Sequence, residues 1–283
     1  MDFDRLQKWD FAPVKQAYSL RDSLLYGLSV CPLSQPDGQD MSFLYEKNQQ
    51  VLPSMATVLG SPGFWLGEEG TGVDPRRVLH GEQSIEMHGP LAAEGTVIGK
   101  MCVEDIVDKG SDRGVMIYTR RRLQDATSGE LLATLRSTLV VRHPQLIRPA
   151  SQQARTAAIS ELLPTVTQEA RTSPHSALLY RLNGDFNPLH VDAAVALASG
   201  FQRPILHGLC SFGIACRVIV RTLCDNQAVR LKGMSARFAA HVFPGETLRM
   251  EIEKTVPGEA AFQVRVIERD VLAMVKGHLL YSI

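Results

Sequence analysis

The sequence predicts an α+β protein made of two similar halves, each containing an antiparallel sheet. Long runs of alternating apolar and polar residues, typical of strands with one buried face, recur in both halves. Turn residues separate these runs, for example Pro257-Gly258 in the second half and Ser128-Gly129 in the first. One long apolar segment, residues 206–223, is spaced as a helix and precedes the strands of the second half. Such a helix can bury its apolar face in a curved sheet, so we expect the two to pack as one unit.

The second half has a clear predicted order. A strand at 176–182 leads into a polar loop, a short helix at 192–199 and then the long helix. Four strands follow the long helix, and we expect them at 229–242, 247–255, 260–269 and 271–282.

The first half repeats this theme without a long central helix. Its strands are expected at 84–87, 97–107, 114–123 and 131–142, after a helix at 13–27. The segment between Pro53 and Gly81 contains too many helix breakers for a continuous helix: Gly60, Pro62, Gly63, Gly67, Gly70 and Gly72. We therefore predict a first half at 1–145 with a degenerate central helix, a linker at 146–172 and a second half at 173–283.

The composition excludes several classes of protein. Thirty basic and thirty acidic side chains balance, so no overall charge favours nucleic acid or an anionic membrane as a partner. No apolar run approaches the roughly 18 residues of a membrane span, and the Met-Asp-Phe-Asp-Arg start does not resemble a signal peptide. We expect a soluble protein located in the cytoplasm.

The cysteines and histidines do not predict a metal site. Five cysteines occur at spacings that fit no zinc module, and the eight histidines form no His-x-His or His-Glu-x-x-His pair. Three of the cysteines, Cys210, Cys216 and Cys224, lie in or near the long helix, where cysteine commonly behaves as a small buried hydrophobe. We expect neither disulfides nor a bound metal.

The segment that starts at Tyr180 concentrates acid and base chemistry. Asp185, Asn187 and His190 lie within six positions, and Pro188 tightens the loop between them by restricting its own φ and the conformation of Asn187. A carboxylate and an imidazole in one loop can move protons to and from a water molecule. The same residue types also form ordinary turns, with Asp185 or Asn187 acting only as a cap, and the loop alone does not decide between these roles.

A second element lies about twenty residues further on. His207-Gly208 stands at the start of the predicted long helix. A helix that begins with glycine leaves backbone N–H groups uncovered, and these favour negative charge that develops on a substrate oxygen. Gly208 is therefore a candidate oxyanion donor.

The loop resembles the signature of the type-2, R-specific enoyl-CoA hydratases, which are relatives of the MaoC-like dehydratases. Seven positions match an aromatic residue, a spacer and Gly-Asp-x-Asn-Pro-Leu-His: Tyr180, Gly184, Asp185, Asn187, Pro188, Leu189 and His190. Asn183 departs from the Ser, Thr, Gly or Cys that the family usually carries. The resemblance implies a double hotdog fold and reversible hydration of a trans-2-enoyl-CoA to a (3R)-3-hydroxyacyl-CoA. It also implies that Asp185 and His190 act on water, that Asn187 orients them and that the Gly208 N–H polarises the thioester carbonyl.

The resemblance extends into the first half. The Val-Leu-His-Gly-Glu-Gln run at 78–83 and Asp-Lys-Gly at 108–110 are similar to segments that line the coenzyme A and acyl site of the family. Together with an aromatic of the second half, they imply four substrate-binding residues: His80, Gly81, Lys109 and Phe238. From the residues alone, an exposed Lys109 and a partly buried His80 without a role in binding are equally plausible.

Two other functions are compatible with the sequence. Hotdog proteins include acyl-CoA thioesterases, and a non-catalytic acyl-CoA-binding protein could share the fold. The intact Asp185 and His190 argue against the second alternative. The sequence leaves open which of the two is base or acid. We expect no cofactor, since coenzyme A is part of the substrate, and a chain that can be complete alone or pair as a homodimer.

Overall fold

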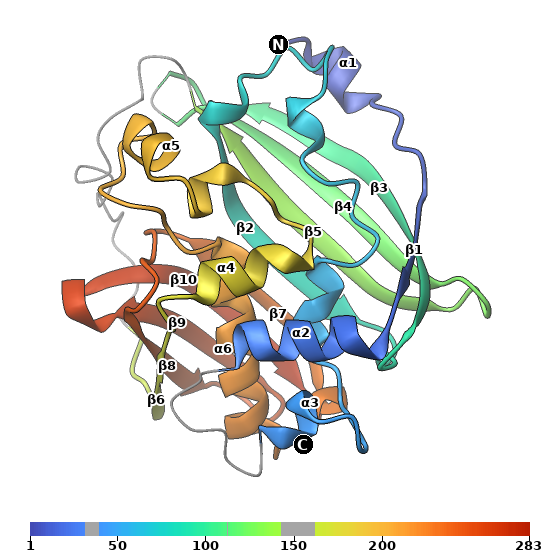
Figure 1. Cartoon of the computed structure of the whole chain (residues 1–283), viewed down its shortest axis with the longest axis vertical. Coiled ribbons are helices and arrows are strands. Elements are labelled where there is room, and N and C mark those ends of the chain that lie inside the picture. Colours follow the sequence, from blue (N-terminus) through green and yellow to red (C-terminus); the bar gives the residue numbers. More distant parts are fainter. Residues whose placement is uncertain (32–39, 112, 143–161) are drawn as a thin grey trace.

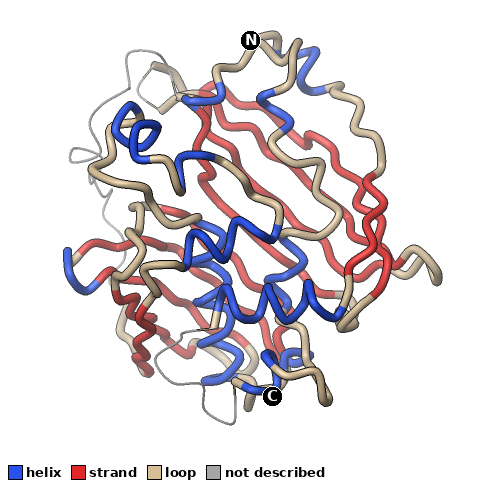
Figure 2. The backbone as a smooth tube through the Cα atoms, viewed as in Figure 1, coloured by secondary structure: helices blue, strands red, loops and turns tan. Residues whose placement is uncertain are grey.

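The computed structural model describes residues 1–31, 40–111, 113–142 and 162–283 as one ten-stranded antiparallel sheet with helices against one face (Figures 1 and 2). The strand order is β1-β3-β4-β5-β2-β7-β10-β9-β8-β6. The strands of the first half are β1 (Val14–Tyr18), β2 (Val78–Met87), β3 (Gly95–Asp108), β4 (Val115–Asp125) and β5 (Leu131–Val141). Those of the second half are β6 (Val166–Arg171), β7 (Leu231–Phe238), β8 (Thr247–Lys254), β9 (Glu259–Val266) and β10 (Val271–Tyr281).

Six α-helices lie in the described residues. They are α1 (Phe3–Gln7), α2 (Leu20–Val30), α3 (Met41–Leu44), α4 (Ser176–Tyr180), α5 (Ala193–Ala198) and α6 (Gly208–Leu223). Short 3-10 helices are η1 (Pro53–Thr57), η2 (Trp65–Gly67), η3 (Pro75–Arg77), η6 (Arg181–Asn183), η7 (Pro188–His190), η8 (Ala228–Arg230) and η9 (Ile267–Arg269). None of these helices is long and apolar enough to cross a bilayer.

The two halves have the same topology. In each, an outer strand is followed by helical segments and then by four strands, giving the order β1-β3-β4-β5-β2 in the first half and β6-β8-β9-β10-β7 in the second. The inner strands β2 and β7 pair antiparallel from Glu82 opposite Arg237 to Glu86 opposite Gly233, which makes the sheet continuous. The predicted two-repeat architecture is confirmed, and all eight strands predicted after the helical segments are present.

The core of the second half is α6. Its apolar face, which includes Phe212, Cys216 and Ile219, is buried against the sheet, and α2 and η1 of the first half pack on it as well. Each large apolar side chain that becomes fully buried contributes about 1.5–3 kcal/mol. The helix predicted at 206–223 is therefore confirmed, and it links the two halves through a shared core.

The strand predicted at 176–182 is wrong, because this segment forms α4 and η6. Ala177 and Tyr180 are buried while Leu178 is 51% exposed, which is the three-residue spacing of a helix face. A short apolar run does not distinguish strand from helix by its periodicity, and here the packing of α4 on α2 decides for the helix.

The helix predicted at 13–27 is also wrong in its first part. Val14–Tyr18 is strand β1, which pairs with β3, and helix α2 begins after Ser19. Ser19 and Asp22 form a capping box, the Ser-x-x-acid signal that marks the true helix start. The Pro/Gly/Asp loop expected after this helix lies mostly outside the described residues.

The predicted linker at 146–172 extends too far. Its residues 146–161 lie outside the described residues, but Val166–Arg171 is strand β6, which pairs with β8 along its whole length. The second half therefore includes the last part of the predicted linker, as the outer strand of its sheet.

Within its described residues, the first half has no counterpart of α6. The glycine-rich segment contains only η1, η2 and η3 between Pro53 and β2, as the sequence predicts. The place of a helix is partly filled by Trp65 and Leu66, which pack with Leu6 against Val103 and Ile117 of the sheet. The degenerate repeat is thus closed by an irregular segment in this region.

A buried ion pair connects α6 to the first half. Arg217 of α6 is 1% exposed, and its Nε and Nη2 donate to Oδ1 of Asp40 at 2.9 and 2.6 Å. The guanidinium also lies 4.6 Å from the centre of the Phe43 ring. Removing one member of such a pair leaves the other charge buried without its partner.

We expect Asp40→Ala to lower the free energy of unfolding by about 3–5 kcal/mol, since Arg217 would remain charged in the core. The exposed pair between Arg249 and Glu169 is the matched control, and Glu169→Ala should cost less than about 1 kcal/mol. Urea unfolding of both variants measures the difference. Equal and small losses in the two variants would contradict the assignment of a buried, stabilising partner to Arg217.

Candidate active site

The loop between α4 and α5 has a rigid hydrogen-bonded shape. Gly184 ends η6 with a φ of 110°, which reverses the chain and is a conformation favoured by glycine. Oδ1 of Asp185 then accepts the backbone N–H of Asn187 at 3.2 Å, and Oδ1 of Asn187 accepts that of Leu189 at 3.0 Å. Asn187 therefore shapes the loop. Its side chain caps the start of η7, and its backbone N–H holds the carboxylate of Asp185.

His190 is held in one orientation by a backbone carbonyl. Its Nδ1 lies 2.8 Å from the oxygen of Ile205, which can only accept a hydrogen bond. The neutral ring therefore carries its proton on Nδ1 and keeps the lone pair of Nε2 for another partner. Burial lowers the pKa of His190, with the Ile205 carbonyl and Asp185 acting in the opposite direction.

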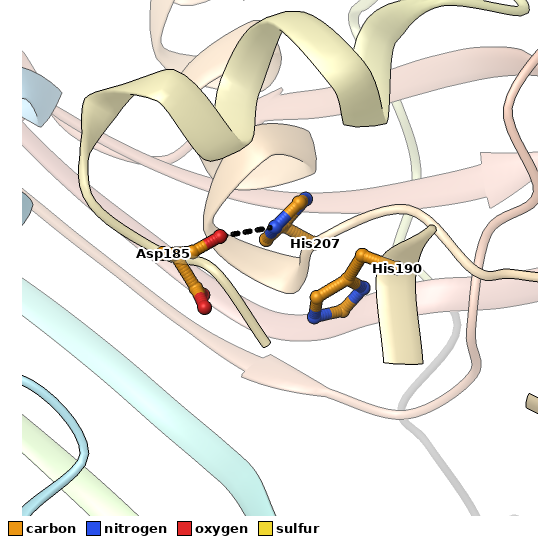
Figure 3. A group of neighbouring side chains, drawn as sticks. All are labelled: Asp185, His190 and His207. Carbon is orange, nitrogen blue, oxygen red and sulfur yellow. Dashed lines mark hydrogen bonds between the residues drawn. The ribbon is translucent and has the colours of Figure 1, made fainter. Parts of the chain in front are cut away.

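His207 joins these two residues. It is 1% exposed, its Nε2 donates to the backbone oxygen of Asp185 at 3.2 Å, and its ring stacks on His190 with centroids 3.7 Å apart (Figure 3). Burial, followed by the proximity of His190, lowers its pKa to about 4. In the sequence His207 stands directly before Gly208, but its contact with His190 follows only from the fold.

Gly208 is the first residue of α6. The N–H groups of Cys210 and Ser211 bond to the His207 oxygen, whereas the N–H of Gly208 has no partner within the described part of the chain. A Cβ at Gly208 would lie 3.3 Å from Cε1 of Phe238. The helix start therefore presents a free donor with an aromatic ring beside it.

The first half contributes His80 to the same region. The His80 and Phe238 ring centroids are 5.1 Å apart in an edge-to-face contact across the β2–β7 pair. Burial lowers the pKa of His80 to about 4, against the opposing influence of the nearby Asp185 carboxylate. Gly81 follows at a bulge of β2, where a Cβ would lie 2.9 Å from Cγ2 of Val140.

Lys109 is not part of this cluster. It is exposed in the turn between β3 and β4, where its backbone N–H bonds to the oxygen of Gly114. The structure thus brings together Asp185, His190, Gly208, His80 and Phe238, places Asn187 and Gly81 as shaping residues, and leaves Lys109 apart.

Asp185, His190 and His207 each offer one metal-ligand atom, and these atoms lie within 4.8 Å of one another. The two imidazoles are stacked with an angle of 27° between their planes, so their lone pairs lie side by side and do not converge on one point. A tetrahedral zinc site needs converging lone pairs. We assign no metal to these residues.

Two cavities lie away from this cluster. One, of about 290 Å³, is lined by residues such as Gln49, Met87 and Leu231 at the opposite end of the β2–β7 pair, and the other, of about 350 Å³, by polar residues such as Glu82 and Lys276. Neither is lined by Asp185, His190 or His207. The contacts among these side chains, and not a cavity, define the site.

Comparison with known families matches both halves. Residues 16–143 match the MFE-2 hydratase 2 N-terminal domain, and residues 158–276 match the MaoC like domain. The chain is 36% identical to the peroxisomal enoyl-CoA hydratase 2 of Arabidopsis thaliana, over 84% of this chain and 82% of that protein. The chain belongs to the hydratase 2 family of MaoC-like dehydratases. It is also 37% identical to the 3-hydroxyacyl-thioester dehydratase Y of Mycobacterium tuberculosis, over 91% of this chain and 89% of that one.

Solved structures agree on the fold of this hydratase 2 family member. A MaoC-like dehydratase from Phytophthora capsici superposes with a TM-score of 0.83 at 28% identity, covering 100% of this chain and 98% of the other. A Mycobacterium tuberculosis protein described as having a double hotdog fold superposes with a TM-score of 0.56 at 14% identity, covering 94% and 92% of the two chains. The predicted double hotdog is confirmed.

We expect His207 to remain neutral at pH 5, with its proton on Nε2, because burial holds its pKa near 4. Nitrogen-15 NMR of the histidine rings reports both the tautomer and the pKa. An ordinary pKa of about 6.5 for His207 would contradict the geometry.

The same shift makes stability depend on pH. Between about pH 6.5 and pH 4 the unfolded chain takes up a proton at His207 that the folded protein does not. The free energy of unfolding should therefore fall as the pH drops through this window.

Proposed function

We propose that this protein catalyses the reversible addition of water to a trans-2-enoyl-CoA, giving a (3R)-3-hydroxyacyl-CoA. The observation that carries the proposal is the approach of Asp185 and of the free Nε2 of His190 to one space beside the start of α6. The family membership and the names of the relatives support the substrate class, and the R configuration rests on the resemblance of the catalytic loop.

The reaction needs a base that takes a proton from water and a group that delivers a proton to C2. The water oxygen bonds to C3 of the enoyl group while one of its protons passes to Asp185 or His190. The same proton, or one from the other residue that it then replaces, is delivered to C2, so the hydroxyl of water ends on C3 and its hydrogen on C2. Asn187 keeps the Asp185 carboxylate oriented through the loop, and no cofactor is required.

Negative charge develops on the thioester oxygen as water adds. The Gly208 N–H at the positive end of α6 donates a hydrogen bond to this oxygen and stabilises its charge, and loss of such a donor typically costs on the order of 3 kcal/mol in the transition state. His80 and Phe238, which come from the β2–β7 pair, form one side of the site and contact the substrate. Gly81 and Lys109 complete the proposed substrate-binding set, with Lys109 acting at a distance from the reacting carbons.

An assay with crotonyl-CoA separates hydration from the alternatives. A hydratase removes the enoyl absorbance without releasing free thiol, a thioesterase releases thiol, and a binding protein does neither. A cytoplasmic location and a homodimer stay predictions; the Arabidopsis relative is peroxisomal.

We expect Asp185→Asn and His190→Ala each to lower the hydration kcat by on the order of 10²-fold or more, as for a lost proton-transfer group. Asp185 lies in the loop and His190 ends η7, and neither belongs to the hydrophobic core, so the melting temperature should stay near that of the wild type. Initial rates with crotonyl-CoA and thermal melts measure the two effects. Near-wild-type turnover in either variant would show that the proton-transfer assignment is wrong.

We expect Gly208→Ala to lower kcat/KM by about 10²-fold, because a methyl group beside Phe238 obstructs the carbonyl that the N–H must reach. The φ of Gly208 is not in the left-handed region, so the melting temperature should change by only about 2–4 °C, as for a loss near 1 kcal/mol. Gly89→Ala is the control, since its Cβ would have ordinary contact at 3.7 Å from Leu132. Full activity, or unfolding tens of degrees early, would reject the oxyanion role.

A further inference from the structure

His207 occupies the N-cap position of α6 without capping it. Its side chain makes no hydrogen bond to the first turn of the helix. Ser, Thr, Asp and Asn are the residues that stabilise this position, so the needs of α6 do not explain a histidine here. The imidazole instead donates its Nε2 hydrogen to the Asp185 oxygen at 3.2 Å, 22 positions earlier in the chain.

The ring of His207 contacts two further aromatic rings. His190 stacks on it at 3.7 Å with an interplanar angle of 27°, and Tyr180 lies at 5.1 Å with an angle of 48°. These two neighbours belong to separate elements, since Tyr180 ends α4 and His190 ends η7, whereas His207 precedes α6. The His207 ring therefore contacts both the backbone of Asp185 and the ring of His190 (Figure 3).

We infer that His207 is a positioning residue of the proposed hydration reaction: its hydrogen bond sets the Asp185 backbone, and its stacked ring sets the plane of the His190 imidazole. This inference rests on the proposed function for its catalytic consequence. The geometry that supports it is independent of the substrate. A misplacement of about 1 Å in a reacting group can cost 10²-fold in rate, which is the scale on which such a residue acts.

The surroundings of His207 favour its neutral form. The groups that face it are His190 and Arg181, which lower its pKa, and Asp185, which raises it, while burial has the largest effect. The neutral ring carries its hydrogen on Nε2, where it bonds to the Asp185 carbonyl.

Two substitutions separate the hydrogen bond from the stacked ring. His207→Gln can place an amide N–H near the position of Nε2, whereas His207→Phe keeps a stacked ring and has no donor. We expect His207→Phe to lower the kcat for crotonyl-CoA by about 10- to 100-fold with KM changed less than about threefold. The kcat of His207→Gln should be at least tenfold higher than that of His207→Phe, because the amide N–H restores the hydrogen bond. His88→Gln is the control for loss of a hydrogen-bonded histidine outside the site, since His88 is exposed and bonds to Thr134.

A purely structural role predicts a different pattern. In that case activity would follow the melting temperature in all variants, and Gln would be no better than Phe; either result would overturn the inference, as would kcat within twofold of wild type in both variants. The pH profile of kcat/KM adds a second readout, because a His190 ring that has lost its stacking partner should shift the acidic limb in His207→Gln and not in His88→Gln.

A further measurement does not depend on turnover. Nitrogen-15 NMR of His190 in His207→Gln and in the wild type reports its tautomer and pKa. A His190 signal that is the same in His207→Gln as in the wild type contradicts the positioning role, even if the protein hydrates enoyl-CoA. If the wild type fails to hydrate any enoyl-CoA but the His190 signal changes, the proposed function fails while the positioning of His190 by His207 stands. If His207→Phe does not fold, the comparison of His207→Gln with wild type by the same NMR measurement decides.

Discussion

The antiparallel pairing of β2 with β7 is the interaction on which the site depends. It fixes the two repeats in one register, with Ser84 opposite Ser235 and Glu82 opposite Arg237. His80 at one end of β2 then lies against Phe238 at the end of β7, and Phe238 lies against the start of α6. A shift by one residue would turn every side chain of the strand to the other face of the sheet and separate His80 from Phe238.

The second constraint is the use of backbone carbonyls to orient the histidines. The oxygen of Ile205 fixes the proton of His190 on Nδ1, and the oxygen of Asp185 fixes that of His207 on Nε2. Because carbonyl oxygens only accept, each contact determines a tautomer without adding a charge. The catalytic loop can therefore keep both rings neutral in a partly buried site, with one lone pair available for water.

The sequence predicted more of the site than of the connections around it. Asp185, Asn187 and His190 were identifiable because a loop signature is local, and the long helix because its apolar pattern is strong. The segment at 176–182 was misassigned because five apolar or small residues fit either periodicity, and only packing against α2 decides. Strand β6 was missed because a half-exposed edge strand with Thr, Gln, Glu and Arg resembles a polar linker. The role of His207 could not be predicted, since it follows from a ring contact between residues 17 positions apart.

The central claim is that water adds to C3 of the enoyl group and does not attack the thioester carbonyl. The direct measurement is mass spectrometry of the products formed from crotonyl-CoA in water enriched in oxygen-18. The account predicts one heavy oxygen in the 3-hydroxyl group of an intact acyl-CoA, with the label absent from the products of Asp185→Asn at matched times. Heavy oxygen in a free carboxylate, with coenzyme A released, would contradict it.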